Sequence, residues 1–496
     1  MTNNIDPLPG RSLDPDDWDE FRAFAHTVLD DAMGYLQTVR ERAPWQPVPE
    51  AVREALRAPV PMQGSGEAAA YADYRRLIEP YPLGNIHPRF WGWVIGTGTP
   101  LGVLAEMLTA TLNNNAAGHQ QGATFVELQV VGWLRELMGF PEAASGILAS
   151  GGSVANQIAL AVARNAKAPF DVRTQGLTNS PRMMIYGSTE THNSVARAVE
   201  LLGMGSESFG EVPVTGDFRI NVEALRERIA TDRARGYLPT CVVANAGTVN
   251  TAAIDPLDEL ADLCRDEDLW LHVDGAFGAL AILDPDSRGL LEGMERADSL
   301  AFDLHKWMYL PYEVACTLIR DGAQHTATFE HHADYLAEVG GGIATGPVMF
   351  ADYSPQLSRS FRALKVWLNL RAYGVGRFAE AIARNIRQAA FLAELVASEP
   401  ELELLAPVSL NIVNFRYRGQ GLSKDALNPL NAKILAELQE RGIAVPSSTE
   451  LDGRFALRVA ITNHRSRRDD FEALVTAVLE LGRELDDSGR MVHRTS

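Results

Sequence analysis

Two short stretches of the sequence contain side chains that could perform acid–base or covalent chemistry. Residues 271–277 read L-H-V-D-G-A-F and include Asp274, and Lys306 follows 32 residues later within F-D-L-H-K-W. Each residue follows a short apolar run of the kind that forms a buried strand. A carboxylate there could hold a cationic ring nitrogen, and a partly desolvated lysine could form a Schiff base with an aldehyde. The alternative is a structural aspartate and lysine at the rim of a sheet, where charges are common.

Two further segments add side chains that suit an anionic ring compound. Residues 149–153 read A-S-G-G-S and lead into V-A-N-Q-I-A-L-A-V-A, a helical run. Glycines before a helix N-terminus let backbone N–H groups and the Ser153 hydroxyl approach a phosphate, although such a sequence is also a common turn. His192, in S-T-E-T-H-N-S, could stack on a planar ring, although a lone histidine is more often structural.

The elements that must position these residues are strands alternating with helices between about Gly146 and Asp321. Five apolar runs are predicted to be strands: 183–186, 240–244, 269–274, 299–302 and 314–319. Three helical patterns lie between them: 195–202, 222–234 and 257–266. This alternation predicts an α/β fold with a largely parallel sheet, whose ligands bind at the carboxyl ends of the strands. All four chemical features are therefore expected at one edge of one sheet.

The rest of the chain predicts helices before this sheet and a smaller α+β unit after it. An amphipathic helix is expected from Trp18 to about Arg42. Helices are predicted over 361–373 and 376–397, then strands over 409–417 and 455–461 with helices over 431–441 and 468–485. The predicted division is an N-terminal helical segment (1–110), a large α/β domain (111–375) and a small C-terminal α+β domain (376–496).

The composition excludes several classes of partner. The chain has 496 residues, of which 45 are basic and 64 acidic, and its net charge of −19 opposes binding to nucleic acid or anionic membranes. Cys241, Cys264 and Cys316 are scattered, which predicts neither disulfides nor a thiolate metal site and favours a reducing cytoplasm. The N-terminus lacks the pattern of a secretory signal, and no run of about 20 apolar residues is present.

Taken together, these residues resemble the pyridoxal-phosphate-dependent group II amino-acid decarboxylases, the family of aromatic-L-amino-acid decarboxylase and glutamate decarboxylase. The similarity runs from about Ile86 to Arg483. Its landmarks, in order, are H-P-R-F at His87, S-G-G-S at Ser150, T-H-N-S-V-A-R-A at Thr191, A-G-T at Ala246, I-D-P-L at Ile254, H-V-D-G-A at His272, H-K-W at His305, S-R-S-F-R-A-L-K-V-W at Ser358 and L-R-V-A-I-T-N-H-R at Leu457. The resemblance implies a PLP-dependent transferase-like large domain of fold type I.

The resemblance also implies roles for individual residues. Lys306 would bind the aldehyde of pyridoxal 5'-phosphate, and Asp274 would hold the protonated pyridine nitrogen. His192 would stack on one face of the ring and Ala276 would pack on the other. The remaining cofactor contacts would come from Gly152, Ser153 and His305 at the phosphate and from Thr248 in the A-G-T motif. Once bound, the cofactor accepts the electron pair that carbon dioxide leaves behind.

The substrate and the product are predicted from two more matches. Tyr335, in A-D-Y-L, lies 29 residues after Lys306, where relatives carry a loop tyrosine that could protonate Cα after carbon dioxide leaves. Trp93 and Val94 match pocket-lining positions, and the nearby Phe90 and Trp91 could add to an aromatic wall or be ordinary core. The prediction is an aromatic L-amino acid that is converted to its amine. The alternatives are a non-aromatic substrate, oxidative decarboxylation to an aldehyde or, against the retained site residues, an inactive scaffold.

The sequence departs from the family pattern at several points. Val249 replaces a frequent threonine after Gly-Thr, Asp303 replaces a frequent asparagine near the phosphate, and residues 115–124 differ from the aromatic enzymes. An anion at Asp303 would repel a phosphate, so its side chain is expected to turn toward a positive neighbour or a backbone amide. Arg359 and Lys365 match a basic motif without an assigned role. The resemblance further implies a homodimer, with the N-terminal helical segment on the partner.

Overall fold

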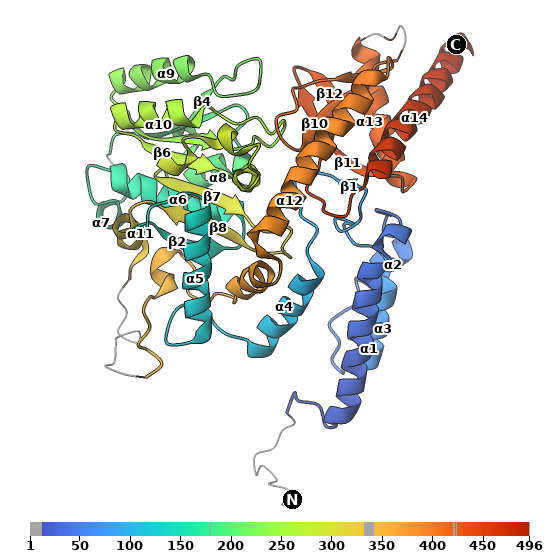
Figure 1. Cartoon of the computed structure of the whole chain (residues 1–496), viewed down its shortest axis with the longest axis horizontal. Helices are drawn as coiled ribbons and strands as arrows, with labels where there is room; N and C mark the ends of the chain where they lie inside the picture. Colours follow the sequence, from blue (N-terminus) through green and yellow to red (C-terminus); the bar gives the residue numbers. More distant parts are fainter. Residues whose placement is uncertain (1–11, 179, 332–341, 420–421, 423, 496) are drawn as a thin grey trace, which may run out of the picture.

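The central element of the computed structural model is a seven-stranded sheet (Figure 1). The structure describes residues 12–178, 180–331, 342–419, 422 and 424–495. The strands, in chain order, are β2 (Ser145–Ala149), β3 (Met183–Ser188), β4 (Phe209–Val212), β5 (Leu238–Asn245), β6 (Trp270–Asp274), β7 (Ser299–Asp303) and β8 (Ala315–Ile319). Their spatial order is β2-β8-β7-β6-β5-β3-β4, and only β8 runs antiparallel to its neighbours. The predicted α/β architecture with a mostly parallel sheet is confirmed.

Helices cover both faces of this sheet, which is why its strands are almost entirely apolar and buried. On one face lie α6 (Gly152–Lys167) and α8 (Asn193–Leu201), which share a cluster of small and branched side chains with β3 and β5. The other face packs on α5 (Gly122–Leu137), α9 (Val222–Ala234), α10 (Leu257–Asp266) and α12 (Ala363–Ser398). The carboxyl ends of β6 and β7, at Asp274 and Asp303, line a cavity.

The long helix α12 connects the two sheets of the molecule. It contains a break at Gly374, whose φ of 70° is left-handed, so the two helices predicted on either side of this glycine are continuous except for this kink. Its second half packs on a five-stranded sheet of order β1-β11-β12-β10-β9. These strands are β1 (Phe90–Trp91), β9 (Leu402–Leu404), β10 (Ile412–Tyr417), β11 (Val445–Leu451) and β12 (Arg454–Ala460). Helices α13 (Lys424–Glu440) and α14 (Arg468–Thr495) cover this smaller sheet.

The first 110 residues are distributed over both parts of the molecule. Strand β1 pairs in parallel with β11 of the smaller sheet, and α4 (Pro100–Leu112) packs on α12. The preceding helices α1 (Trp18–Gln37), α2 (Glu50–Ala55) and α3 (Glu67–Leu77) form an arm beside the main body (Figure 1). None of their residues is buried. The predicted three-part division stays a prediction, with β1 as the strand that links its first and last parts.

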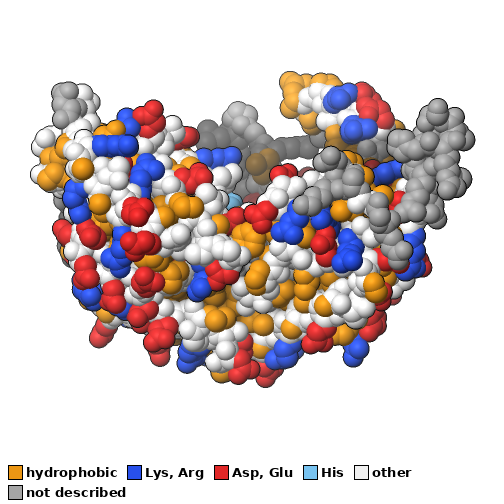
Figure 2. All heavy atoms as spheres, turned by 90° about the horizontal axis from the view of Figure 1, so that it is seen from above, with side chains coloured by type: hydrophobic (Ala, Val, Ile, Leu, Met, Phe, Trp, Pro, Cys, Tyr) orange, Lys and Arg blue, Asp and Glu red, His pale blue; other side chains and the backbone are white. Residues whose placement is uncertain are grey.

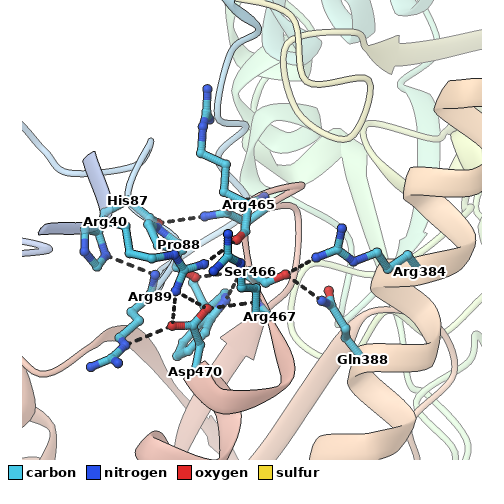
Figure 3. Close-up of polar contacts among 12 residues, drawn as sticks. Arg40, His87, Pro88, Arg89, Arg384, Gln388, Arg465, Ser466, Arg467 and Asp470 are labelled. Carbon is cyan, nitrogen blue, oxygen red and sulfur yellow. Dashed lines mark hydrogen bonds and ion pairs between the residues drawn. The ribbon is translucent and has the colours of Figure 1, made fainter. Parts of the chain in front are cut away.

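The base of this arm is fixed by a buried carboxylate (Figure 3). Arg40 Nη1 and Arg89 Nε lie 2.9 and 3.0 Å from Asp470 Oδ1, and the backbone N–H of Arg467 donates to Oδ2 at 2.8 Å. Arg40 also donates to the carbonyl of Arg465. Loss of these partners would leave the buried Asp470 charge uncompensated and would strongly destabilise the fold. The contact of Arg40 with Asp470 therefore fixes the point at which the arm joins the rest of the molecule.

The surface carries mixed charges. On the face shown in Figure 2, lysine and arginine side chains are interspersed with aspartate and glutamate side chains and form no continuous basic surface. Among the described residues, no helix combines the length and the apolar character that crossing a bilayer requires.

Candidate active site

A cavity of about 330 Å³ opens at the carboxyl edge of the large sheet, where the sequence places the chemistry. It falls in the size range of small-molecule sites, roughly 300–1,000 Å³. It is lined by Ser150, Gly151, Gly152, Ser153, Asn156, His192, Ser194, Asp274, Ala276, Asp303, His305, Lys306, Tyr312 and Glu313. The structure therefore brings together seven of the predicted site residues: Lys306, Asp274, His192, Ala276, His305, Gly152 and Ser153.

Asp274 ends β6 and is held by a chain of hydrogen bonds that starts in the sheet. Trp270 Nε1 donates to Ser299 Oγ at 2.7 Å, and Ser299 Oγ lies 2.9 Å from His272 Nδ1. His272 Nε2 lies 3.0 Å from Asn156 Oδ1, and Asn156 Nδ2 donates to Asp274 Oδ2 at 2.8 Å. Burial lowers the pKa of His272 to about 4, so its ring is neutral and carries one N–H group, which can donate to Asn156 Oδ1.

The other oxygen of Asp274 accepts the backbone N–H of Ala276 at 3.1 Å. The carboxylate is thus buried, bound at both oxygens and fixed at a strand end that faces the cavity. Sequence reasoning missed Asn156, the helix residue that orients it. The available signal was the lone amide in the V-A-N-Q-I-A-L-A-V-A run, because a polar residue among small apolar ones in a buried helix needs a partner.

Lys306 lies beyond the end of β7 and forms an ion pair with Asp303. Its Nζ lies 2.7 Å from Asp303 Oδ2, and its side chain is 23% exposed against 1% for Asp303. The expectation that Asp303 turns toward a positive neighbour is therefore met by Lys306 itself.

Two neutral imidazoles complete the walls. His192 caps the N-terminus of α8: the N–H of Ser194 donates to its Nδ1 at 3.2 Å. Burial lowers the pKa of His192 from its usual value, against the opposing effect of the Asp274 carboxylate. Burial also lowers the pKa of His305, whose Nδ1 accepts the N–H of Val314 at 3.1 Å. Both rings are therefore directed by backbone N–H groups, with Nε2 left as the protonated nitrogen.

The N-terminus of α6 forms one end of the cavity. Its N-cap is Gly151, and no side chain caps the N–H groups of the first turn. A Cβ at Gly152 would lie 2.9 Å from Asp303 Oδ2, so this position is held by close packing. Uncapped N–H groups at a helix N-terminus, with the hydroxyls of Ser150 and Ser153 beside them, suit an anion such as a phosphate.

The residues present fit pyridoxal 5'-phosphate at three points. The α6 N-terminus suits the phosphate, Lys306 suits the aldehyde carbon, and the buried Asp274 carboxylate suits a protonated ring nitrogen. Among the described residues, no three His, Cys, Asp or Glu side chains group closely enough to hold a metal ion.

Thr248 does not line the cavity. Its hydroxyl lies 3.0 Å from that of Thr251 and accepts the N–H of Ala253 at 3.1 Å, so it closes its own loop. The neighbouring Val249 carbonyl accepts a hydrogen bond from Arg458, a buried residue of β12. The loop is thereby tied to the small sheet rather than aimed at the cavity.

The predicted substrate-facing residues also lie away from the cavity within this chain. Phe90 and Trp91 are buried core of β1, and Trp91 stacks on Phe471 at 4.9 Å. Val94 is buried in the large core. Trp93 is 56% exposed, and its carbonyl accepts a hydrogen bond from Arg458 at 3.0 Å. The prediction that Phe90 and Trp91 add to an aromatic wall of the substrate pocket is wrong, because both rings are buried in the core.

The basic motif after Ser358 has a structural explanation. Arg359 and Glu127 form a fully buried ion pair, and Arg359 also donates to the carbonyl of Leu148 at the end of β2. Lys365 pairs with Glu106, and burial lowers its pKa. Tyr335, the predicted proton donor, lies outside the described residues.

The backbone of Gly96 packs closely against that of His305 and Lys306. A Cβ built on this glycine would lie 2.0 Å from the carbonyl oxygen of His305 and 2.4 Å from that of Lys306. Both are backbone atoms that a rotamer change cannot move. The segment that contains Gly96 is fixed in turn by Arg465, whose Nη1 donates to the carbonyl of Thr97 at 3.1 Å.

Comparisons with known proteins agree with this geometry. The family model described as the pyridoxal-dependent decarboxylase conserved domain matches residues 49–418. The aromatic-L-amino-acid decarboxylase of Bacillus atrophaeus is 35% identical to the chain over 95% of it and 97% of the relative. The L-2,4-diaminobutyrate decarboxylase of Rhizobium meliloti is 32% identical over 86% and 84%. These two relatives act on chemically different side chains.

A solved structure shows the same fold. The chain superposes on Oryza sativa TDC, solved with PLP and tryptamine, with a TM-score of 0.88 over 96% of this chain and 100% of that chain. The sequence identity is 24%, so this likeness concerns the fold.

We expect Gly96→Ala to displace the backbone that carries Lys306. Overpacking of this kind costs about 1–3 kcal/mol or more in the free energy of unfolding, which urea denaturation would measure. Retention of bound cofactor, followed by visible absorbance, should fall in parallel. Gly132→Ala is the matched control, because a Cβ at Gly132 in α5 meets nothing within 4 Å and should stabilise the helix. Equal stability of the two variants would contradict the inference that the close approach of Gly96 to His305 and Lys306 requires a glycine.

Proposed function

The chain belongs to the pyridoxal-dependent decarboxylase family, and from this premise we propose that it converts an aromatic L-amino acid to its amine and carbon dioxide in the cavity around Lys306. That it is a pyridoxal-phosphate-dependent amino-acid decarboxylase follows from the family. The placement of the reaction in this cavity is supported above all by one observation: Lys306, Asp274, His192 and the uncapped α6 N-terminus line it together.

The proposed roles follow from the chemistry of each group. When bound, the cofactor supplies an electron sink for the bond that breaks. Lys306 would hold the aldehyde carbon, and Gly152, Ser153 and His305 would hold the phosphate. Asp274 would keep a proton on the ring nitrogen, a charge-assisted hydrogen bond that contributes about 1.5–3 kcal/mol.

The neutral imidazole of His192 suits contact with a planar ring, since an uncharged ring is cheaper to desolvate there than an imidazolium. Ala276 would contact the same ring. The roles of Thr248 and Tyr335 stay predictions from the family motif, Thr248 with its hydroxyl bound within its own loop and Tyr335 outside the described residues. Tyr335 would deliver the proton to Cα once carbon dioxide has left.

Covalent attachment to Lys306 is the first expectation to test. The chain has five lysines, Lys167, Lys306, Lys365, Lys424 and Lys433. Borohydride reduction of the holoenzyme followed by peptide mapping should place the cofactor on Lys306. Lys306→Ala should lose the visible absorption band and at least about a thousandfold in kcat, as for other groups that act as a unit. Lys433→Ala, at an exposed position of α13, should keep both. A label on a different lysine would overturn the proposal.

The aromatic substrate is supported by the relative from Bacillus atrophaeus, whose name states that class, while the relative from Rhizobium meliloti bears the name of a diamino-acid enzyme. Trp93 is the aromatic residue of the predicted wall that packing leaves exposed. It would contact a substrate only if another surface, such as that of a second subunit, covered it. The substrate preference would then depend on the formation of a dimer.

A substrate panel separates the possibilities. Tyrosine, phenylalanine and tryptophan should give kcat/KM values about tenfold or more above those of glutamate, aspartate and diaminobutyrate, the discrimination that an apolar pocket provides. Amine and carbon dioxide should appear in equal amounts. Carbon dioxide release from the polar substrates alone would contradict the aromatic class. Aldehyde with peroxide and ammonia, instead of amine, would contradict the role of Tyr335.

We also propose a homodimer in which the N-terminal segment packs on a second copy. The aromatic rings of α1 and α3, from Trp18 to Tyr74, pack on one another rather than on the body. A stripe on α4 is exposed as well, formed by Val103, Met107, Leu108 and Leu112. Apolar surface of this extent on an arm beside the main body is typical of an interface between subunits.

The double variant Met107→Glu/Leu112→Glu should weaken this dimer. Two carboxylates buried in an apolar contact would raise the dissociation constant by at least about a hundredfold. Sedimentation should then report the monomer mass of 54.2 kDa in place of twice that value. Leu201→Glu is the matched control, since Leu201 is equally apolar and 71% exposed at the end of α8. A wild-type monomer, or a variant that remains dimeric, would contradict the proposed interface.

A further inference from the structure

Asp303 is a carboxylate that the proposed cofactor contacts do not use. It ends β7, where its backbone N–H donates to the carbonyl of Ala276 at 2.8 Å and its register pairs it with Ala315 on β8. Its side chain is almost fully buried and lines the cavity beside the first turn of α6. A carboxylate at this position would repel the phosphate that is expected there, so its negative charge requires a compensating partner.

The negative charge of Asp303 is compensated by Lys306. Oδ2 lies 2.7 Å from Lys306 Nζ, whereas Oδ1 is buried and has no hydrogen-bond partner among the described residues. The nearest ring nitrogen, His305 Nε2, is 3.9 Å from Oδ1, too far for a hydrogen bond. A buried carboxylate with one satisfied oxygen is costly without its counter-ion.

The other charged groups around the cavity have partners of their own. Asp274 accepts hydrogen bonds from Asn156 and from the backbone of Ala276. Glu313 pairs with Arg362 at 2.9 Å. Lys365, which approaches from α12, pairs with Glu106.

The remaining titratable groups are neutral at pH 7. Burial lowers the pKa of His192 and His305, so neither ring supplies a positive charge. Burial also raises the pKa of Tyr312, whose ring lies against His305, to about 12. Lys306 is therefore the cation that Asp303 faces.

We propose that Asp303 is a positioning residue that holds the ammonium group of Lys306 whenever this lysine is free. This inference rests on the proposed function, in which the substrate nitrogen takes the place of Lys306 on the aldehyde carbon. The exchange forms one carbon–nitrogen bond and breaks one. A substrate that enters as an ammonium ion brings the three hydrogens with which Lys306 leaves as an ammonium ion, so no other reactant is needed.

Asp303 then gives the released ammonium a fixed position. Because the two residues are three apart across the turn after β7, Lys306 can reach Asp303 by side-chain rotation without backbone movement. The ion pair holds the ammonium group turned toward the first turn of α6. An asparagine in this place would bind the lysine without compensating its charge.

Chemical labelling of lysines in the cofactor-free, full-length protein tests this directly. The cofactor is removed with hydroxylamine, and acetylation by acetic anhydride is followed at each of the five lysines by peptide mass spectrometry between pH 6 and 10. Only the neutral amine reacts. Asp303→Asn should therefore raise the rate at Lys306 by about tenfold to a hundredfold at neutral pH, the range for a lost charge-assisted hydrogen bond.

Two controls make the result specific. Asp274→Asn removes a carboxylate from the same cavity but leaves the ion pair of Lys306 with Asp303 intact. Its effect on the labelling rate at Lys306 should therefore be much smaller. Buried Lys365 reports the fold and should stay slow in both variants. If Asp303→Asn does not fold, Asp303→Ser provides a smaller side chain for the same comparison.

An unchanged rate at Lys306 in a folded Asp303 variant would overturn the proposal, and so would an equal rise in Asp274→Asn. Neither outcome bears on the proposed function, which borohydride trapping of the cofactor and the substrate panel test separately.

Discussion

The site depends on keeping one buried carboxylate in place at the end of a strand. Asp274 lies in the middle of the large sheet, where its register pairs it with Asn245 on β5 and Ala301 on β7. A charge at such a place is stable only with hydrogen bonds at both oxygens. The bonds come from Asn156 and from the backbone of Ala276, and Asn156 is oriented from behind by His272. The position of α6, and with it the anion-binding end of the cavity, is therefore coupled to the carboxylate.

The sequence predicted five of the seven strands of the large sheet, all but β2 and β4, because hydrophobic periodicity and strand-end chemistry are local signals. Helices α9 and α10 begin and end at the predicted residues, and Asp274 ends β6 as expected. The meeting of Lys306, Asp274 and His192 followed from one rule, that parallel strands present their carboxyl ends at one edge. Side-chain partners are not local. Nothing in the sequence around Thr248 shows that its hydroxyl closes its own loop.

Long-range pairing explains the other differences. Strand β1 has two residues and pairs with β11, more than 350 positions later, so no local pattern could identify it. This pairing buries Phe90 and Trp91 in the core and leaves Trp93 exposed, in a left-handed conformation with φ of 51°. An aromatic residue in a motif can face a substrate or the core, and only the register of the strand decides between the two. Arg458 then holds the carbonyl of Trp93 and that of Val249 together.

The two carboxylates of the cavity differ in what satisfies them, and this difference separates their functions. Asp274 is bound by neutral donors, so its negative charge remains available for a cationic ring nitrogen. Asp303 is bound by Lys306, the cation that the proposed reaction would release and recapture. A phosphate bound at the α6 N-terminus would add negative charge near Asp303, and the positive charge of Lys306 would then offset both anions whenever the lysine is free. An aspartate in place of the frequent asparagine is thus compatible with an anionic cofactor because Lys306 carries the compensating charge.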